Sequence, residues 1–268
     1  MKRYLQFILV STMVLTTPNP APATEIIAHR GSSNAAPENT VAAANLAWQQ
    51  NADAVELDIH QSADGRIIVI HDDTTSRTAK ALLKVKETSS SELRALDAGT
   101  FKDKKYAGEK LPFLEEMIAT VPSGAKRLFV EVKCGKEVLP ELKKVLEAGG
   151  KMKQMVIIGF DFDTMVAAKA MFPKVPVYWL RGTRKEEGSK KLLPHDAAWI
   201  PKVKSAGLDG LDVGYAGITP EFAKAVKEAG LGLYAWTVDD PDEAQRLKSL
   251  GVDGITTNRP DLIRKTLE

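Results

Sequence analysis

Strand and helix patterns alternate through the second half of the chain, and this alternation limits the folds that the sequence can adopt. Short apolar runs typical of buried strands are separated by segments with a helical spacing of apolar residues. The predicted segments, in order, are helix 114–120, strand 127–132, helix 136–148, strand 155–160, helix 164–171, strand 175–180, helix 196–206 and strand 210–213. Repeated units of this kind predict a parallel sheet covered by helices.

The same alternation continues toward the C-terminus, where helix starts carry recognisable signals. Thr219 followed by Pro220 is typical of a helix N-terminus, and strand 231–236 follows that helix. Asp240 starts the next helix, with Glu243 placed as its capping-box partner. These signals add two more strand–helix units to the predicted sheet.

The sequence contains nine strand candidates, from residues 26–28 to residues 254–256, one more than an eight-stranded barrel takes. We assign the extra strand to residues 54–71, where two apolar runs are separated only by residues 60–66. That spacing is too short for a crossover helix and predicts a hairpin-like arm. With 268 residues and 44% hydrophobic content, the chain can bury the core of one large domain. The predicted fold class is α/β, a (β/α)8 TIM barrel.

Residues 74–112 interrupt the regular pattern after the third strand segment. They contain no convincing strand, many Lys, Ser, Thr and Asp residues, and one short helical pattern, residues 90–96. This composition predicts an insertion of small helices and loops. A solvated connector is the alternative to a segment that shapes the site, but the length of the insertion favours a functional role.

The first residues of the chain resemble a targeting segment. Lys2 and Arg3 precede an apolar run over residues 4–15, and small residues lead to Ala23. This pattern predicts a secretory signal peptide, cleaved after Ala23, and hence a periplasmic or secreted protein. A membrane anchor needs about 17 to 25 apolar residues, and the run here is shorter and is broken by Gln6.

The chain therefore divides into a signal peptide, residues 1–23, and a barrel, residues 24–268. Removal of the signal peptide leaves 35 basic and 35 acidic residues, because only Lys2 and Arg3 are lost. A neutral mature chain predicts neither a nucleic-acid surface nor a polybasic membrane patch, and no stable membrane anchor is expected after cleavage. Cys134 is the single cysteine, so an internal disulfide and a cysteine-rich zinc site are excluded, and it is expected to pack as a small apolar residue.

Candidate functional residues gather at the ends of the predicted strands. Strand 26–28 ends at His29, and the run that ends at Ile70 is followed by His71. Glu56 and Asp58 alternate on one strand, so their side chains point the same way about 7 Å apart along the chain. An oxygen-only cluster of this kind favours a hard cation such as magnesium or calcium.

Glu131 and Lys133 repeat the same-face spacing and bring a third carboxylate and a cation to the same place. Active sites of α/β barrels lie at the carboxyl ends of the strands. The residues expected near those ends are His29, Glu56, Asp58, His71, Glu131, Lys133 and Trp236.

The histidines and Trp236 each have a structural alternative. A single histidine at a strand end is more often a core or rim residue than a catalyst, but two occur here with three carboxylates. Histidine suits acid and base work because its unperturbed pKa is about 6.5. His60 is either pocket lining or plain surface, and His195 is expected at the surface. Trp236 is either barrel packing or an apolar wall.

The candidate site residues belong to a series of short motifs that occur in a fixed order along the chain. They are His29-Arg30-Gly31, Pro37-Glu38-Asn39-Thr40, Glu56-x-Asp58, Asp64-Gly65, His71-Asp72, Glu131-x-Lys133, Trp236-Thr237-Val238 and Gly251-Val252-Asp253-Gly254-Ile255. This series resembles the glycerophosphodiester phosphodiesterase family, and the resemblance covers essentially all of residues 24–268. It implies a metal-dependent enzyme that hydrolyses glycerophosphodiesters, small-molecule substrates, to sn-glycerol 3-phosphate and an alcohol.

The resemblance also assigns roles. It implies that Glu56, Asp58 and Glu131 bind one divalent cation, Mg²⁺ or Ca²⁺. It implies that His29 and His71 are the general acid and base, in an order that the sequence leaves open, and that the attacker is water or the glycerol 2-hydroxyl. Arg30, Lys133 and Trp236 are then the expected phosphate- and substrate-binding residues.

Two positions depart from the family pattern: Asn258 stands where Asp is usual, and Phe113 stands where Thr is common. They affect the expected substrate preference more than activity. The alternatives are a related barrel phosphodiesterase acting on intact phospholipid or another head group, and a non-catalytic module that binds glycerophosphoryl groups. Retention of both histidines and all three carboxylates argues against the binding module.

Overall fold

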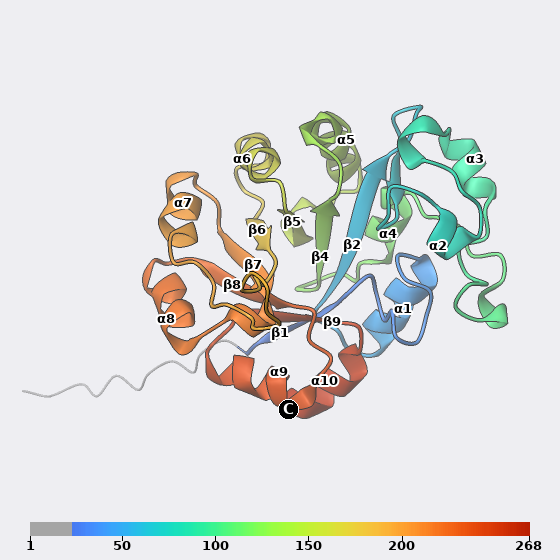
Figure 1. The fold of residues 1–268 in the computed structure, drawn as a ribbon. Helices are drawn as coiled ribbons and strands as arrows, with labels where there is room; N and C mark the ends of the chain where they lie inside the picture. The colour runs from blue at the N-terminus through green and yellow to red at the C-terminus, as the bar shows by residue number, and fades with distance from the viewer. Residues whose placement is uncertain (1–22) are drawn as a thin grey trace, which may run out of the picture.

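The computed structural model describes residues 23–268, and eight parallel strands form a closed barrel inside a ring of helices (Figure 1). The predicted (β/α)8 fold is confirmed. The signal peptide predicted for residues 1–23 lies outside the described residues except for Ala23. Among the described helices, none has both the length and the apolar character needed to cross a membrane.

The barrel strands follow the order of the chain. They are β1 Glu25–Ala28, β2 Ala54–Gln61, β4 Arg127–Val132, β5 Met155–Gly159, β6 Val177–Arg181, β7 Gly210–Gly214, β8 Gly232–Trp236 and β9 Gly254–Thr257. The barrel closes because β1 pairs in parallel with both β2 and β9. The ninth strand, β3 (Ile67–Val69), pairs antiparallel with β2 and lies outside the closed ring, so the predicted hairpin-like arm is confirmed.

Helices cover the outside of the barrel (Figure 1). The main ones are α1 Val41–Gln49, α4 Leu114–Thr120, α5 Leu139–Ala148, α6 Phe162–Met171, α7 Trp199–Ser205, α8 Pro220–Glu228, α9 Pro241–Ser249 and α10 Pro260–Leu267. Thr219 caps α8 as predicted, since its side chain accepts a hydrogen bond from the backbone N–H of Phe222. Asp240 caps α9, but the capping-box bond expected of Glu243 is wrong, because its carboxylate binds Arg246 at 2.9 Å instead.

The insertion after β3 folds into short helices beside β2 and β3, as Figure 1 shows. They are α2 Ser76–Ala79, η1 Val85–Glu87, α3 Ser90–Ala95 and η2 Lys104–Tyr106. Ser89 and Glu92 form a capping box that starts α3, which confirms the helical pattern predicted there. A separate small core attaches the insertion to the arm, because Val85 and Leu93 pack against Ile68 and Ile70.

Side chains that point into the barrel fill its N-terminal end. The Phe129 and Tyr178 rings pack on Tyr234, with centroids 5.5 and 4.8 Å away. Glycines on neighbouring strands leave space for these rings: a Cβ at Gly232 would lie 2.8 Å from Tyr178, and one at Gly254 would lie 2.7 Å from Tyr234. The cavity that the structure leaves inside the barrel therefore lies at the other end, where the strands finish.

Candidate active site

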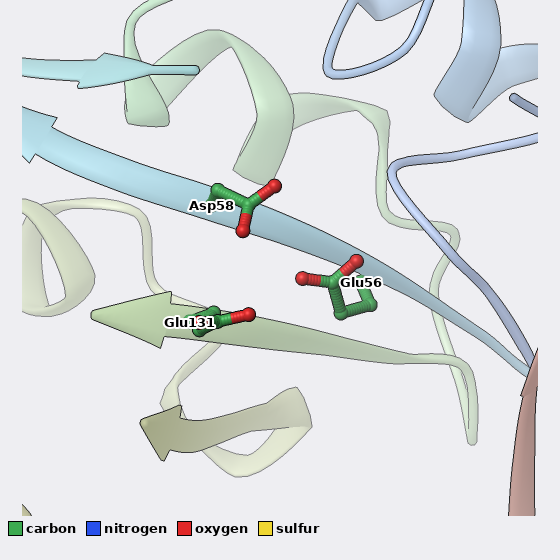
Figure 2. A group of neighbouring side chains, drawn as sticks. All are labelled: Glu56, Asp58 and Glu131. Atoms are coloured by element: carbon green, nitrogen blue, oxygen red, sulfur yellow. The ribbon is translucent and has the colours of Figure 1, made fainter. Parts of the chain in front are cut away.

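Three buried carboxylates meet between β2 and β4. Figure 2 shows Glu56 and Asp58 on β2 and Glu131 on β4 with their carboxyl groups directed toward one another. One oxygen from each lies within 4.8 Å of the others, and all three residues are buried. Asp58 and Glu131 are register partners in the parallel pair, and the two-residue repeat of a strand turns Glu56 to the same side. The structure thus brings the predicted ligand set together.

Two cations border this carboxylate cluster. The backbone N–H of Arg30 donates to Glu56 Oε2 (2.9 Å), and its guanidinium Nε lies 3.1 Å from Asp58 Oδ2. The Lys133 ammonium lies 2.8 Å from Glu131 Oε1 and 3.7 Å from Asp58 Oδ1. Arg30 adopts a positive φ of 55°, which directs both its backbone and its side chain at the cluster. Arg30 and Lys133 therefore lie where the sequence predicted them.

The carboxylate cluster fits a divalent cation. Glu56 Oε1 and Asp58 Oδ1 are buried without a hydrogen-bond partner, although unpaired buried oxygens are costly. Burial, followed by the charge of Asp58, raises the pKa of Glu131 to about 7 and the pKa of Glu56 well above its usual value. The donor atoms are all carboxylate oxygens, the ligands that Mg²⁺ and Ca²⁺ prefer. A bound divalent ion would satisfy the unpaired oxygens and offset the excess negative charge.

His71 is held by an acidic neighbour and faces a lysine. Its Nδ1 lies 2.6 Å from Asp72 Oδ1, and its Nε2 lies 3.2 Å from Lys133 Nζ. Hydrogen bonds from Arg77 hold the pKa of Asp72 below its usual range, so Asp72 stays a carboxylate. His71 Nδ1 is therefore the donor to Asp72, and Nε2 is the ring atom directed at the site.

His29 is held by the residue that follows the last strand. Its Nδ1 lies 2.7 Å from Asn258 Oδ1, and Asn258 Nδ2 donates in turn to Asp239 Oδ2 (2.6 Å). The amide orientation fixes Asn258 Oδ1 as the acceptor, so His29 Nδ1 carries the proton. Burial, with the charge of Arg30, lowers the pKa of His29 to about 4. The ring is neutral above this pH and leaves Nε2 free to accept a proton.

A cavity of about 270 Å³ connects these groups. The ionisable residues that line it are His29, Arg30, Glu56, His71, Glu131, Lys133 and Asp212. The opposite wall is mainly apolar and includes Ile158, Phe160, Leu180 and Trp236. Trp236 serves both roles considered for it, because it lines the cavity and also packs edge-on against Phe160 at 5.6 Å between centroids.

A larger depression of about 740 Å³ lies at the opposite end of the barrel, beside the tyrosine cluster. Its charged lining residues are paired with one another: Arg127 with Glu25, Lys227 with Asp253 and Arg264 with Asp53. Self-paired charges leave few groups to recognise a ligand. The smaller cavity is the candidate active site because Glu56 and Asp212, which line it, each have a buried carboxyl oxygen without a hydrogen-bond partner.

The structure also places His195, His60 and Cys134, and it corrects the interpretation of His195. His195 was expected at the surface, but it is only 6% exposed. The segment after β6 folds back over β7, and His195 Nε2 donates a hydrogen bond to the backbone oxygen of Gly214 (2.7 Å). His60 is partly buried and bonds the backbone oxygen of His71 (3.1 Å). Cys134 packs half-buried against the main core, as expected.

Sequence reasoning missed two groups in the site. Asn258 was noted only as a departure from a pattern, yet it directly orients His29. Asp212 was read as part of an apolar strand, yet its buried carboxyl lines the active-site cavity. A usable signal for both is their position near a strand end, where barrel active sites lie: Asn258 directly follows β9, and Asp212 lies two residues before the end of β7.

Comparison with known proteins agrees with this geometry. Residues 29–262 match the model of the glycerophosphoryl diester phosphodiesterase family. A glycerophosphodiester phosphodiesterase of Caldanaerobacter subterraneus subsp. tengcongensis is 32% identical over 250 residues, which cover 90% of this chain and 98% of that protein. The chain belongs to the glycerophosphoryl diester phosphodiesterase family.

Solved structures show the same relationship. A phosphodiesterase from Oleispira antarctica, in complex with the product sn-glycerol-3-phosphate, superposes with a TM-score of 0.82 and 29% identity over 91% of this chain and 96% of that chain. A glycerophosphodiester phosphodiesterase from Agrobacterium tumefaciens superposes with a TM-score of 0.74 and 27% identity over 90% of this chain and 99% of that chain. The family resemblance predicted from the motifs is thus confirmed.

Proposed function

We propose that this protein hydrolyses glycerophosphodiesters to sn-glycerol 3-phosphate and an alcohol. Family membership and the related structure that holds sn-glycerol-3-phosphate support this reaction. The observation that carries the proposal is a buried carboxylate cluster flanked by two anchored histidines at one cavity. A phosphodiester placed there would meet cations and proton-transfer groups together.

One divalent cation, Mg²⁺ or Ca²⁺, is the proposed cofactor, and Glu56, Asp58 and Glu131 would hold it. Their unpaired oxygens and excess negative charge support this assignment. When bound, such an ion supplies Lewis-acid stabilisation to a phosphoryl oxygen. Arg30 and Lys133, which already border the cluster, would bind the remaining phosphate charge.

The two histidines divide the proton transfers. His29 has its Nδ1 proton held by Asn258 and a lowered pKa, so its neutral Nε2 suits it to be the general base. His71 has its Nδ1 held by the Asp72 carboxylate and its Nε2 directed at the site, and it is the proposed general acid. Trp236 forms the apolar wall beside the reacting group.

The two histidines account for both proton transfers of the proposed reaction. The attacking hydroxyl, from water or from the glycerol 2-hydroxyl, forms a new P–O bond and gives its proton to His29 Nε2. The P–O bond to the alcohol breaks, and the departing oxygen takes a proton from His71. If the glycerol hydroxyl attacks first, a cyclic phosphate forms, and water opens it with the two roles reversed. His71, which has given up its proton, then takes the proton of the attacking water, and His29 returns its proton to the departing glycerol oxygen.

Release of sn-glycerol 3-phosphate from a panel of glycerophosphodiesters tests the function. We expect release by the wild type with Mg²⁺ or Ca²⁺, loss with a chelator, and loss in H29A and E131Q. E228Q, on the exposed end of α8, is the matched carboxylate control and should keep full activity. Folded wild type that releases no product with any substrate or divalent metal would refute the proposal and favour an intact-lipid substrate or a binding module.

We also propose that the protein is exported, to the periplasm or the medium. The basic start, apolar run and small residues before Thr24 support this localisation. N-terminal sequencing of the protein recovered from cells should begin at Thr24. An intact Met1 on the recovered protein would contradict the proposal.

A further inference from the structure

Asp212 is a buried carboxyl group in the active-site cavity that the proposed chemistry does not use. Its neighbours on β7, Leu211 and Val213, pack outward in the core between barrel and helices, so strand alternation turns Asp212 inward. It is 1% exposed, lines the cavity, and its Oδ1 has no hydrogen-bond partner. Burying an oxygen without a hydrogen-bond partner destabilises the fold, which indicates that a ligand supplies the missing hydrogen bond.

Asp212 stands apart from the proposed metal ligands. In residues 23–268, the acidic groups whose oxygens gather within 4.8 Å of one another are Glu56, Asp58 and Glu131, and Asp212 is not among them. It lies across the barrel from β2, on the strand between β6 and β8. A role for Asp212 in the same cation site is therefore not indicated by the geometry.

The surroundings of Asp212 favour a hydroxylated group. Leu180 is its register partner on β6, and Ile158 and Trp236 line the same side of the cavity. An anionic phosphate has cations available on the other side of the cavity, at Arg30 and Lys133. A hydroxyl group, in contrast, can donate a hydrogen bond to a carboxyl oxygen whether or not that carboxyl is protonated.

We propose that Asp212 accepts a hydrogen bond from a hydroxyl of the substrate's glycerol group and so selects glycerol over an unsubstituted three-carbon chain. This inference rests on the proposed function. The cavity, at about 270 Å³, is small, and Asp212 lies deep within it, so it suits the glycerophosphoryl unit that all the substrates share. The variable alcohol then extends toward the open mouth of the barrel.

Two ligands with the same phosphate and the same carbon chain isolate the contribution of the hydroxyls. We would measure the binding of sn-glycerol 3-phosphate and of n-propyl phosphate by calorimetry, with the divalent cation present. The wild type should prefer sn-glycerol 3-phosphate by about 10- to 100-fold, the size expected for hydrogen bonds to a charged or buried acceptor. D212L should bind both ligands equally and keep the wild-type affinity for n-propyl phosphate.

D212N is the matched variant, because its amide oxygen keeps the acceptor and the shape. It should retain most of the preference, whereas D212L should lose it. Equal affinity of the wild type for the two ligands would overturn the inference, and so would a preference that survives in D212L or a D212L defect equal for both ligands. If thermal unfolding shows that D212L does not fold, D212A carries the same expectations.

The same protein preparations separate this inference from the proposed function. Wild type that releases sn-glycerol 3-phosphate but shows no preference for it over n-propyl phosphate refutes only the role of Asp212. Wild type that neither releases product nor binds either phosphate refutes the proposed function itself.

Discussion

A hydrogen bond of 2.7 Å from His29 Nδ1 to Asn258 Oδ1 joins the first and last strands of the barrel. His29 directly follows β1 and Asn258 directly follows β9, the strands that pair where the barrel closes. Asn258 is itself fixed by Asp239, which receives both its backbone and its side-chain N–H groups. The position of the proposed base therefore depends on closure of the barrel.

Replacing Asn258 should affect turnover more than binding. In N258L the His29 Nδ1 loses its acceptor, and we expect kcat to fall by about 10- to 100-fold, as for other residues that orient a functional histidine, with a small change in KM. N258D keeps the acceptor and should retain activity. Steady-state kinetics of folded N258L and N258D make the comparison, and unchanged kcat in N258L would contradict the role.

The pH profile should report the environment of His29. The pKa of His29 is lowered to about 4, so a base at this position stays neutral above that pH. We expect kcat/KM of the wild type to fall on the acid side only near pH 4 to 5 rather than near 6.5. In N258D the added carboxylate favours the protonated ring, raises its pKa and should move the acid limb to higher pH. If the pH profiles of the wild type and N258D coincide, His29 is not the group whose protonation causes the loss of activity in acid.

Asp72 should support His71 in a way that its neighbour Asp73 does not. The Asp72 carboxylate lies 2.6 Å from the His71 ring, whereas Asp73 is exposed. We expect D72N to lower kcat by about 10- to 100-fold, because the ring loses its carboxylate partner and the amide can present its NH2 group, which holds the ring in the wrong tautomer. D73N is the control and should stay within about twofold of the wild type. Equal kinetics of D72N and D73N would remove Asp72 from the mechanism.

Glu38 should make stability depend on acid pH. Burial would raise its pKa, but hydrogen bonds and charges from Arg77 and Arg30 outweigh burial and lower it to about 2. Since the folded value lies below the usual 4.5, the stabilisation is present above about pH 5 and is lost as the pH falls from about 4.5 toward 2.

The E38Q variant measures this contribution. At pH 7 we expect E38Q to lower the free energy of unfolding by about 1 to 3 kcal/mol, and the difference from the wild type should shrink toward pH 3. Urea unfolding of both proteins at pH 7 and pH 3 makes the comparison. A difference that is constant over this range would show that Glu38 does not carry a lowered pKa.

Metal binding should be visible in the stability of the fold as well as in activity. A divalent ion that binds the carboxylate cluster of the folded state should stabilise it by about 2.7 kcal/mol at a metal concentration of 100 times Kd. Thermal unfolding of chelator-treated protein with added Mg²⁺ or Ca²⁺ should show this increase. E56Q should lose most of it, whereas E228Q should keep it, and an equal response of both variants would place the ion elsewhere.

Periodic features of the site could be predicted from sequence, and isolated ones could not. Glu56 with Asp58, and Glu131 with Lys133, lie two residues apart on strands, so alternation alone places each pair on one face. Barrel topology then brings the two strands together, because β2 and β4 become neighbours once the β3 arm leaves the ring. The carboxylate cluster followed from these two rules.

Asp212 and His195 show why other features of the structure were not predicted from the sequence. Asp212 is a single polar residue between apolar neighbours on β7, and the closure of the barrel brings it to the same cavity as residues from β2 and β4. His195 lies in a polar segment, and its burial depends on how the chain between β6 and α7 folds onto Gly214. Long-range loop packing of this kind leaves no local sequence signal.

The aromatic cluster at the N-terminal end of the barrel makes the interior a well with one opening. Phe129, Tyr178 and Tyr234 occupy the axis there, with Gly232 and Gly254 giving them room. Substrate therefore enters and both products leave by the same route. In the proposed binding mode the alcohol lies nearer the opening, so we expect the alcohol to depart first and sn-glycerol 3-phosphate to depart last. In that case sn-glycerol 3-phosphate is the product that would compete with the next substrate for the empty well.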